Sequence, residues 1–376
     1  MLISTFLDGL FESTLRLGRS RFWLPFLGLV FLVVIFINGI AIVPEEPYQR
    51  LSENPFITRT DIHFNNYWQD NPLLPVIAYY LRLTSPLAFN LLCFVIIIGA
   101  FLSFALLSYR RWGSSPALVF STLLITSPLT TVMLTWLGTP DGLSLALTIP
   151  FLFTHSSLLV FFLSIPGVMN HPTFIIAVLE ILTLRWAARD GVNFKHLLGA
   201  ALGLVAGYGL IRTFIAVNQI ELVSRIEFML LRGWDEWFKL NALNFPMSVS
   251  SLFNIHWMIL PVCLVMFLKR DKLFYSLALI FLLVNYGFTW FTLDTTRVFS
   301  LLSWGVLFAC IFRSFELALS DRETVPQVHK QYLQALILIG IASCVTPRYF
   351  SWVGEIHTTP FYDFLRKTFR QVVPPK

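Results

Sequence analysis

The sequence predicts an all-α polytopic membrane protein, a transmembrane helical bundle of about ten or eleven spans. Of its 376 residues, 56% are hydrophobic and 13% are charged, whereas soluble domains carry about 25% charged residues. The apolar residues form blocks of about 15 to 25, and a helix needs about 20 residues to cross the hydrocarbon core of a bilayer. We therefore expect one membrane domain covering residues 1–376.

The expected spans follow one another along the chain, bounded by charged residues or by Pro, Gly and Asn. Their approximate bounds are 22–43, 86–108, 116–134, 142–154, 157–168, 173–186, 197–216, 250–268, 273–291, 298–313 and 332–346. The two segments between 142 and 168 are short for spanning helices, so tilted or re-entrant helices are alternatives there. The first segment is too long for the core of a cleaved signal peptide.

Lys and Arg predict the orientation, because cytoplasmic loops carry an excess of both. With a cytoplasmic N-terminus, the inward loops hold Arg16, Arg19, Arg21, Arg110, Arg111, Arg185, Arg189, Lys195, Lys269, Arg270, Lys272, Arg313, Arg322 and Lys330. The C-terminal Arg366, Lys367 and Arg370 fall outside and count against this orientation. The protein is expected in the plasma (inner) membrane or the endoplasmic reticulum.

Two outward segments are more than connectors. Residues 44–85 contain a short apolar stretch, 73–83, that suits an interfacial helix rather than a span. Residues 217–249 are amphipathic and rich in Trp and Phe, which also suits the membrane interface.

Composition excludes several other classes. The basic residues stand singly at the ends of apolar blocks, which is a topological pattern, so we expect no nucleic-acid partner. The four cysteines, Cys93, Cys263, Cys310 and Cys344, lie far apart within apolar blocks. They are expected to be small buried side chains rather than disulfide or zinc ligands.

With this topology, the unusual polar residues gather on the outer face. They are Asp61, His63, Asp70, Asp141, His171, Asp294, Arg297 and Arg348. An extracytoplasmic site at the membrane surface is therefore the hypothesis they favour. Each also has a structural explanation: Asp70 and Asp141 suit helix starts, and Asp294 and Arg297 suit a helical ion pair.

The order of these residues resembles that of the GT-C superfamily of integral-membrane glycosyltransferases, which includes protein O-mannosyltransferases and aminoarabinose transferases. Asp61 precedes Asn71-Pro72-Leu73-Leu74-Pro75, similar to the family's acidic residue followed by a Pro-containing interfacial helix. Thr139-Pro140-Asp141-Gly142-Leu143 matches its second outer acidic turn. Asn170-His171-Pro172-Thr173 and Thr296-Arg297-Val298 look similar to its later polar and basic positions. The likeness covers about the first 190 residues, and then only Arg297.

The resemblance implies an inverting transfer of a sugar from a polyprenyl-phosphate donor to an acceptor hydroxyl on a glycan, lipid or protein. Asp61 and Asp141 would be the catalytic residues, with Asp61 as general base. Arg297, Arg348 and His171 would bind the donor phosphate, and Asp70, Asp294 and His63 would position substrate. The chain departs from the family in having Asn-Pro for His-Pro, no DxD metal motif and no large soluble C-terminal domain. We therefore predict no metal ligands, and a divalent cation is an open alternative.

Other functions fit the same topology. A polysaccharide polymerase or ligase would use Arg225 and Arg232 of the 217–249 segment. A lipid or solute transporter would place charges at mid-membrane, often within inverted repeats. A structural membrane subunit is a further alternative.

Overall fold

The computed structural model describes residues 2–41, 47–60, 67–223, 234–243, 245–292, 294–320, 325–346, 348–352 and 355–359. All eleven predicted apolar segments are helical in it, several of them broken into shorter pieces. From the N-terminus to the middle of the chain the helices are α1 (Leu2–Arg19), α2 (Trp23–Asn38), α3 (Pro47–Glu53), η1 (Tyr67–Asp70), α4 (Leu73–Tyr80), α5 (Pro86–Trp112), α6 (Ser114–Ile125), α7 (Pro128–Thr135), α8 (Asp141–Thr148), η2 (Ile149–Leu152), α9 (Ser157–Asn170) and α10 (Thr173–Ala187).

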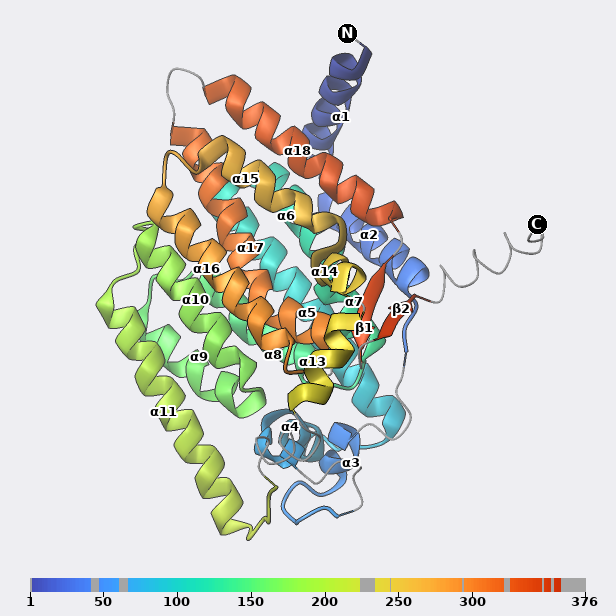
Figure 1. The fold of residues 1–376 in the computed structure, drawn as a ribbon, viewed down its shortest axis with the longest axis vertical. Coiled ribbons are helices and arrows are strands. Elements are labelled where there is room, and N and C mark those ends of the chain that lie inside the picture. Colours follow the sequence, from blue (N-terminus) through green and yellow to red (C-terminus); the bar gives the residue numbers. More distant parts are fainter. Residues whose placement is uncertain are drawn as a thin grey trace, which may run out of the picture.

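The second half begins with α11 (Phe194–Val217), which lies at one edge of the bundle (Figure 1). It continues with α13 (Trp234–Leu243), α14 (Phe245–Phe253), η3 (Asn254–Met258), α15 (Ile259–Phe267), α16 (Lys272–Thr289), α17 (Thr295–Ser320) and α18 (Val325–Val345). A two-stranded antiparallel hairpin, β1 (Tyr349–Trp352) and β2 (Glu355–Thr358), follows.

The prediction of a helical membrane protein is confirmed at the level of helix length and composition. Among the described residues, six helices are long and apolar enough to cross a membrane, or up to eight if each of two bent pairs counts as one span. The bent pairs are α1 with α2, at 115°, and α6 with α7, at 49°. A count of ten or eleven would also need α8, α9 and α10, which are shorter.

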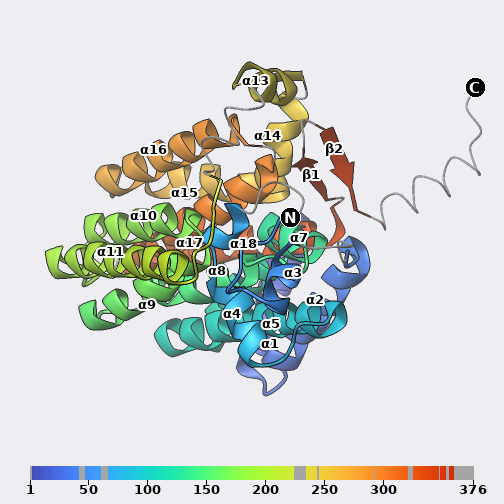
Figure 2. The ribbon, with the colours of Figure 1, turned by 90° about the horizontal axis from the view of Figure 1, so that it is seen from below.

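Helix α17 forms the centre of the bundle. Its membrane-spanning window is 89% buried, whereas the corresponding windows of the other long helices are 28–39% buried. It contacts α10, α16, α14, α15, α18 and α7. Figure 2 shows α15 and α16 on one side of α17 and α5 on the other. The outer helices expose large apolar side chains, such as Leu87 on α5 and Val205 on α11, as expected of a surface that faces lipid.

Helices α1, α3 and η1 and the β1–β2 hairpin were not predicted. Helix α1 lies in the basic N-terminal segment, and α3 and η1 lie in the segment 44–85, where only the stretch 73–83 is predicted to be a helix. The hairpin adds a small β element to a chain predicted to be all-α. Four-residue strands give too short an alternating pattern to be recognised among aromatic residues.

The interfacial predictions are partly tested. The stretch predicted at 73–83 forms α4, eight residues long and too short to span. The described part of 217–249 contains α13 and the beginning of α14, while residues 224–233 and 244 lie outside the described residues.

Glycines bring α11 against α9. Gly199, Gly203 and Gly207 recur every four residues on one face of α11, and a Cβ on Gly203 would lie 2.3 Å from the backbone oxygen of Phe161. Small residues at this spacing let helix backbones approach closely in a membrane, where packing replaces the hydrophobic effect. By contrast, Gly209 on the same helix has open space around it.

We expect Gly203→Ala to destabilise the protein, because overpacking costs about 1–3 kcal/mol. Gly209→Ala is the matched control, and we expect it to be neutral or stabilising by up to about 1 kcal/mol, because Ala favours a helix over Gly. Thermal unfolding of the purified protein in detergent measures both. Equal melting temperatures for the two variants would contradict the close α9–α11 packing.

Candidate functional site

Three predicted residues meet at one end of α17. The Arg297 guanidinium donates to both carboxylate oxygens of Asp141, at 2.6 Å from Nε and 3.0 Å from Nη2. Its Nη1 donates to Asp294 at 3.1 Å. The Asp141 side chain is 1% exposed, and those of Arg297 and Asp294 are 15% and 25% exposed. The two hydrogen bonds to Asp141 fix the plane of the Arg297 guanidinium. The cluster as a whole places one cation between two carboxylates.

The turn before α8 positions Asp141. Asp141 is the first residue of α8, directly after Pro140, where a carboxylate also interacts favourably with the helix dipole. The Asn170 amide donates to Pro140 O and to the Ser144 hydroxyl, both at 2.8 Å. The end of α9 therefore holds the start of α8 in place.

Helix α3 and the C-terminal hairpin border this cluster. The Trp352 side chain on β1 hydrogen-bonds Asp294, and the Ser351 N–H donates to the Thr296 hydroxyl at 2.8 Å. The Tyr48 phenol of α3 interacts electrostatically with Arg297 and stacks on Trp68 with ring centroids 5.5 Å apart.

The remaining predicted residues fall in different places. Asp61 and His63 lie outside the described residues, so their predicted roles stay predictions. His171 is buried beside Asn170, which contacts the Asp141 turn, and its Nδ1 is 2.7 Å from the Thr173 hydroxyl. Asp70, at the end of η1, interacts electrostatically with Arg212 of α11. No described contact joins Asp70 to the Asp141–Arg297 pair.

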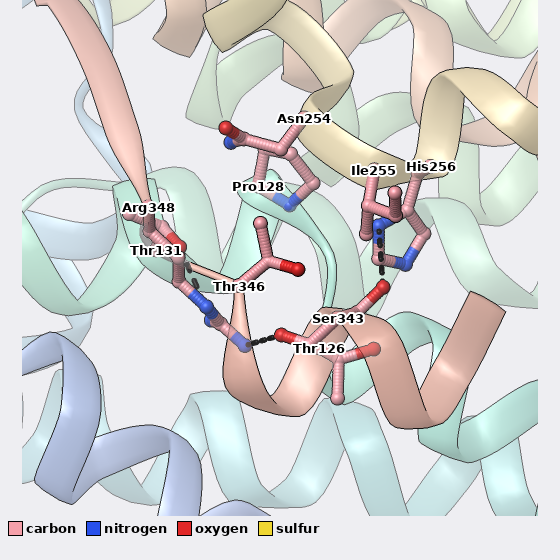
Figure 3. Close-up of a pocket in the computed structure, with 9 residues that line it drawn as sticks. All are labelled: Thr126, Pro128, Thr131, Asn254, Ile255, His256, Ser343, Thr346 and Arg348. Atoms are coloured by element: carbon pink, nitrogen blue, oxygen red, sulfur yellow. Dashed lines mark hydrogen bonds between the residues drawn. The ribbon is translucent and has the colours of Figure 1, made fainter. Parts of the chain in front are cut away.

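Arg348 lies in a pocket of its own rather than in this cluster (Figure 3). Its Nη1 donates to the Thr131 hydroxyl at 3.2 Å and its Nη2 to Ser343 O at 3.4 Å. Strand β1 begins directly after Arg348. Through Ser351 it contacts Thr296, within the Asp294–Arg297 turn.

A second charge network, which sequence reasoning missed, occupies the opposite end of α17. Arg111 is 2.6 Å from both Asp190 and Glu316, and Arg185 contacts Asp190 at 2.8 Å. The predicted inward loops thus hold interlocked ion pairs, whereas the positive-inside pattern alone predicts isolated arginines there. The only sequence signal was the presence of acidic residues in a basic stretch.

The two charge clusters lie a membrane thickness apart. Arg297 and Glu316 are on the same helix, and at 1.5 Å per residue they are separated by about 28 Å along its axis. The hydrocarbon core of a bilayer is about 30 Å thick. Ion pairs at the two ends and an apolar stretch between them therefore suit a helix that crosses the membrane.

One further polar group lies between the two ends. Glu180 on α10 is 5% exposed and accepts a hydrogen bond from the Asn285 amide of α16 at 3.0 Å. The same amide donates to the Ser303 hydroxyl of α17 at 3.1 Å. Glu180 had no partner visible in the sequence, because its partners lie on two distant helices.

Burial and pairing shift the pKa of the loop carboxyl groups in opposite directions. Burial raises the pKa of Asp294, although Arg297 acts to lower it. Burial also acts to raise the pKa of Asp190, but Arg185 and Arg111 outweigh it, so that this pKa is lowered. Asp190 is thus held as an anion, as its position in an ion-pair network requires.

Metal ligands are not grouped in the described part of the chain: no set of three or more His, Cys, Asp or Glu side chains there could hold a metal ion. Cys93, Cys263 and Cys310 are buried, Cys344 is partly buried, and all four are free thiols. The prediction of small buried cysteine side chains is confirmed for the first three.

Comparison of the chain with protein-family models, curated proteins and solved structures gives no match.

We expect Arg297→Gln to destabilise the protein by about 3–5 kcal/mol, because the change leaves the buried Asp141 carboxylate without its cation. Asp141→Asn should destabilise the protein less, because Arg297 keeps Asp294 as a partner. The double variant should lose less stability than the sum of the two single losses, because the groups are coupled. Thermal unfolding in detergent measures all three.

The exposed Asp8–Lys330 pair, 2.7 Å apart, is the control for these three variants. Asp8→Asn should leave the melting temperature unchanged, because exposed ion pairs contribute little. Additive losses at positions 141 and 297 would mean that the pair is not energetically coupled.

Proposed function

We propose that this protein is a membrane glycosyltransferase that moves a sugar from a polyprenyl-phosphate donor to an acceptor hydroxyl at the extracytoplasmic surface. The observation that carries the proposal is the Asp141–Arg297–Asp294 cluster. Asp141 is far in the sequence from Asp294 and Arg297, and the three meet at the end of α17 opposite the Arg111–Asp190–Glu316 network. With the N-terminus in the cytoplasm, that end is the outer one.

The chemistry follows from what each group can do. The acceptor oxygen attacks the anomeric carbon, the bond from that carbon to the phosphate oxygen breaks, and the phosphate leaves with the bonding electrons. A general base takes the proton of the acceptor hydroxyl, and Asp61 is the proposed base. Such proton transfer contributes about 10²–10⁴ in rate. Attack opposite the phosphate inverts the anomeric centre.

Arg297 is the proposed stabiliser of the leaving phosphate. A guanidinium has five N–H donors, and the bonds to Asp141 and Asp294 leave Arg297 with others that can reach a ligand. Asp141 fixes its orientation before the substrate arrives, so no reorganisation is needed during the reaction. His171 is a proposed additional phosphate ligand, and Asp70, Asp294 and His63 are proposed to position substrate.

The membrane setting supports a lipid-linked donor. The exposed apolar helices give a polyprenyl tail a lipid phase to occupy, while the charged cluster stands at the end of α17. The partly exposed aromatic rings of Trp68 and Tyr67 are proposed to stack on a sugar face. The sugar acceptor is a glycan, a lipid or a protein hydroxyl.

We expect Asp61→Asn to abolish transfer by removing the base, and Arg297→Lys to lower the rate by roughly 10²-fold or more, because the bidentate grip is lost. The assay uses purified protein, a panel of polyprenyl-phosphate sugars and a panel of acceptors. Asp8→Asn, an exposed carboxylate change, should retain full activity.

Folding of each variant is checked by its melting temperature in detergent. Full activity of Asp61→Asn removes the proposed base, and full activity of Arg297→Lys removes the proposed phosphate ligand. Absence of transfer by the wild type across the donor panel refutes the proposed function.

A further inference from the structure

Glu180 is a buried carboxyl group without a cation among the described residues. It lies on α10 within the predicted span 173–186 and is 5% exposed. It accepts a hydrogen bond from the Asn285 amide of α16 at 3.0 Å, and the same amide donates to the Ser303 hydroxyl of α17 at 3.1 Å. Asn285 and Ser303 are fully buried. Three helices that lie side by side in Figure 1 therefore bring one carboxyl, one amide and one hydroxyl together.

The charged groups of the neighbouring elements do not compensate Glu180. The elements packed against α10 are α8, α9, α11, α16, α17 and η2, and the sequences of α9 and η2 contain no titratable side chain. The titratable or charged residues of the other elements, with α10 itself, are Asp141, Arg185, Lys195, His196, Tyr208, Arg212, Lys272, Tyr275, Tyr286, Arg297, Cys310, Arg313 and Glu316. Apart from burial, only the Asn285 hydrogen bond acts on the charge of Glu180 among the described residues. An ionised Glu180 would therefore be a buried anion without a counter-ion.

The depth of Glu180 in the bundle makes that anion costly. Its neighbour Ser303 follows Arg297 on α17, and at 1.5 Å per residue about 9 Å separate the two along the helix axis. Glu316, at the other end of α17, is about 20 Å beyond Ser303. A carboxylate at this depth has neither water nor a cation to replace its hydration, so a carboxyl group placed there binds a proton instead.

The hydrogen bonds suit a neutral carboxyl better than a metal ion. Both bonds of Asn285 are made by its nitrogen, so N–H groups occupy the position between the Glu180 and Ser303 oxygens that a cation would need. The Asn285 oxygen is buried and has no partner among the described residues. A protonated carboxyl is a donor as well as an acceptor, whereas a carboxylate only accepts. The Asn285 oxygen is thus an acceptor suited to the protonated form of Glu180 and not to the ionised form.

We propose that Glu180, Asn285 and Ser303 form a proton-binding site inside the helical bundle, and that the neutral Glu180 carboxyl joins α10 to α16 and α17. The ligand is a proton that the chain retains as it folds, because the same side chain in an unfolded chain is in contact with water and ionises above about pH 4.3. The proposal is independent of glycosyl transfer, because it concerns neither the Asp141–Arg297 pair nor a sugar donor.

The site makes stability depend on pH in a characteristic direction. Above about pH 4.3 the folded chain binds one proton more than the unfolded chain at this position, so the contribution of the site is complete below that pH and decreases as the pH rises. One proton changes the unfolding equilibrium constant about tenfold per pH unit. Glu180→Gln keeps the shape and one acceptor oxygen of the neutral carboxyl and removes the titration. We expect its melting temperature to differ least from that of the wild type near about pH 5, and to exceed it by a growing margin up to about pH 8.

Infrared difference spectroscopy of the full chain at neutral pH reads the protonation state directly. The spectrum of the wild type minus that of Glu180→Gln should contain the C=O band of a neutral carboxylic acid, shifted in deuterated water, and no carboxylate bands. Glu180→Leu removes the same carboxyl by a different substitution and should lose the same band. Glu12→Gln is the matched control, because Glu12 of α1 is exposed. Its difference spectrum should contain carboxylate bands and no band of a neutral acid.

Three results would overturn the proposal. The first is carboxylate bands in the Glu180 difference spectra, because they show that the buried group is ionised. The second is a melting-temperature difference between the wild type and Glu180→Gln that stays constant or narrows as the pH rises. The third is loss of the neutral-acid band when sodium chloride replaces choline chloride, which assigns the site to a metal cation. All of these measurements are made without a sugar donor, so failure of the transfer assay leaves them unaffected.

Discussion

The burial of α17 is the constraint on which the rest of the structure depends. A helix enclosed by other helices cannot send its charged side chains to water, so each charge it carries needs a partner from a neighbour. Arg297 is partnered by Asp141 of α8, and Glu316 by Arg111 of α5. The same pairs that neutralise α17 therefore fix the ends of two other helices, at levels about 28 Å apart along its axis.

Between those levels, cohesion comes from close packing and hydrogen bonds, because lipid tails are as apolar as the side chains they touch. The glycines of α11 allow backbone contact with α9. The Glu180, Asn285 and Ser303 side chains connect α10, α16 and α17, and Tyr275 of α16 bonds the Ser314 hydroxyl of α17 at 2.7 Å. These bonds satisfy groups that would otherwise be unpaired in a medium without water.

The two arginines near the C-terminal hairpin have different electrostatic surroundings. Arg297 sits between two carboxylates, which orient it and balance its charge. Arg348, immediately before the strand that contacts the Arg297 turn, bonds only neutral oxygens among the described residues. The carboxylates therefore fix the plane of the Arg297 guanidinium, whereas the oxygens around Arg348 leave its charge unbalanced.

The sequence by itself determined where the apolar helices lie and which polar residues stand at their ends, because the length of an apolar block and the charges that bound it are local properties. It also placed Asp141 and Arg297 at the same end of the bundle. Only the tertiary structure decided that these two side chains are paired, that Arg348 occupies a separate pocket, and that Arg111 and Arg185 belong to an ion-pair network. Pairing depends on which helices are neighbours, and in a membrane every apolar helix face resembles every other, so helix order in space is not written in the hydropathy pattern.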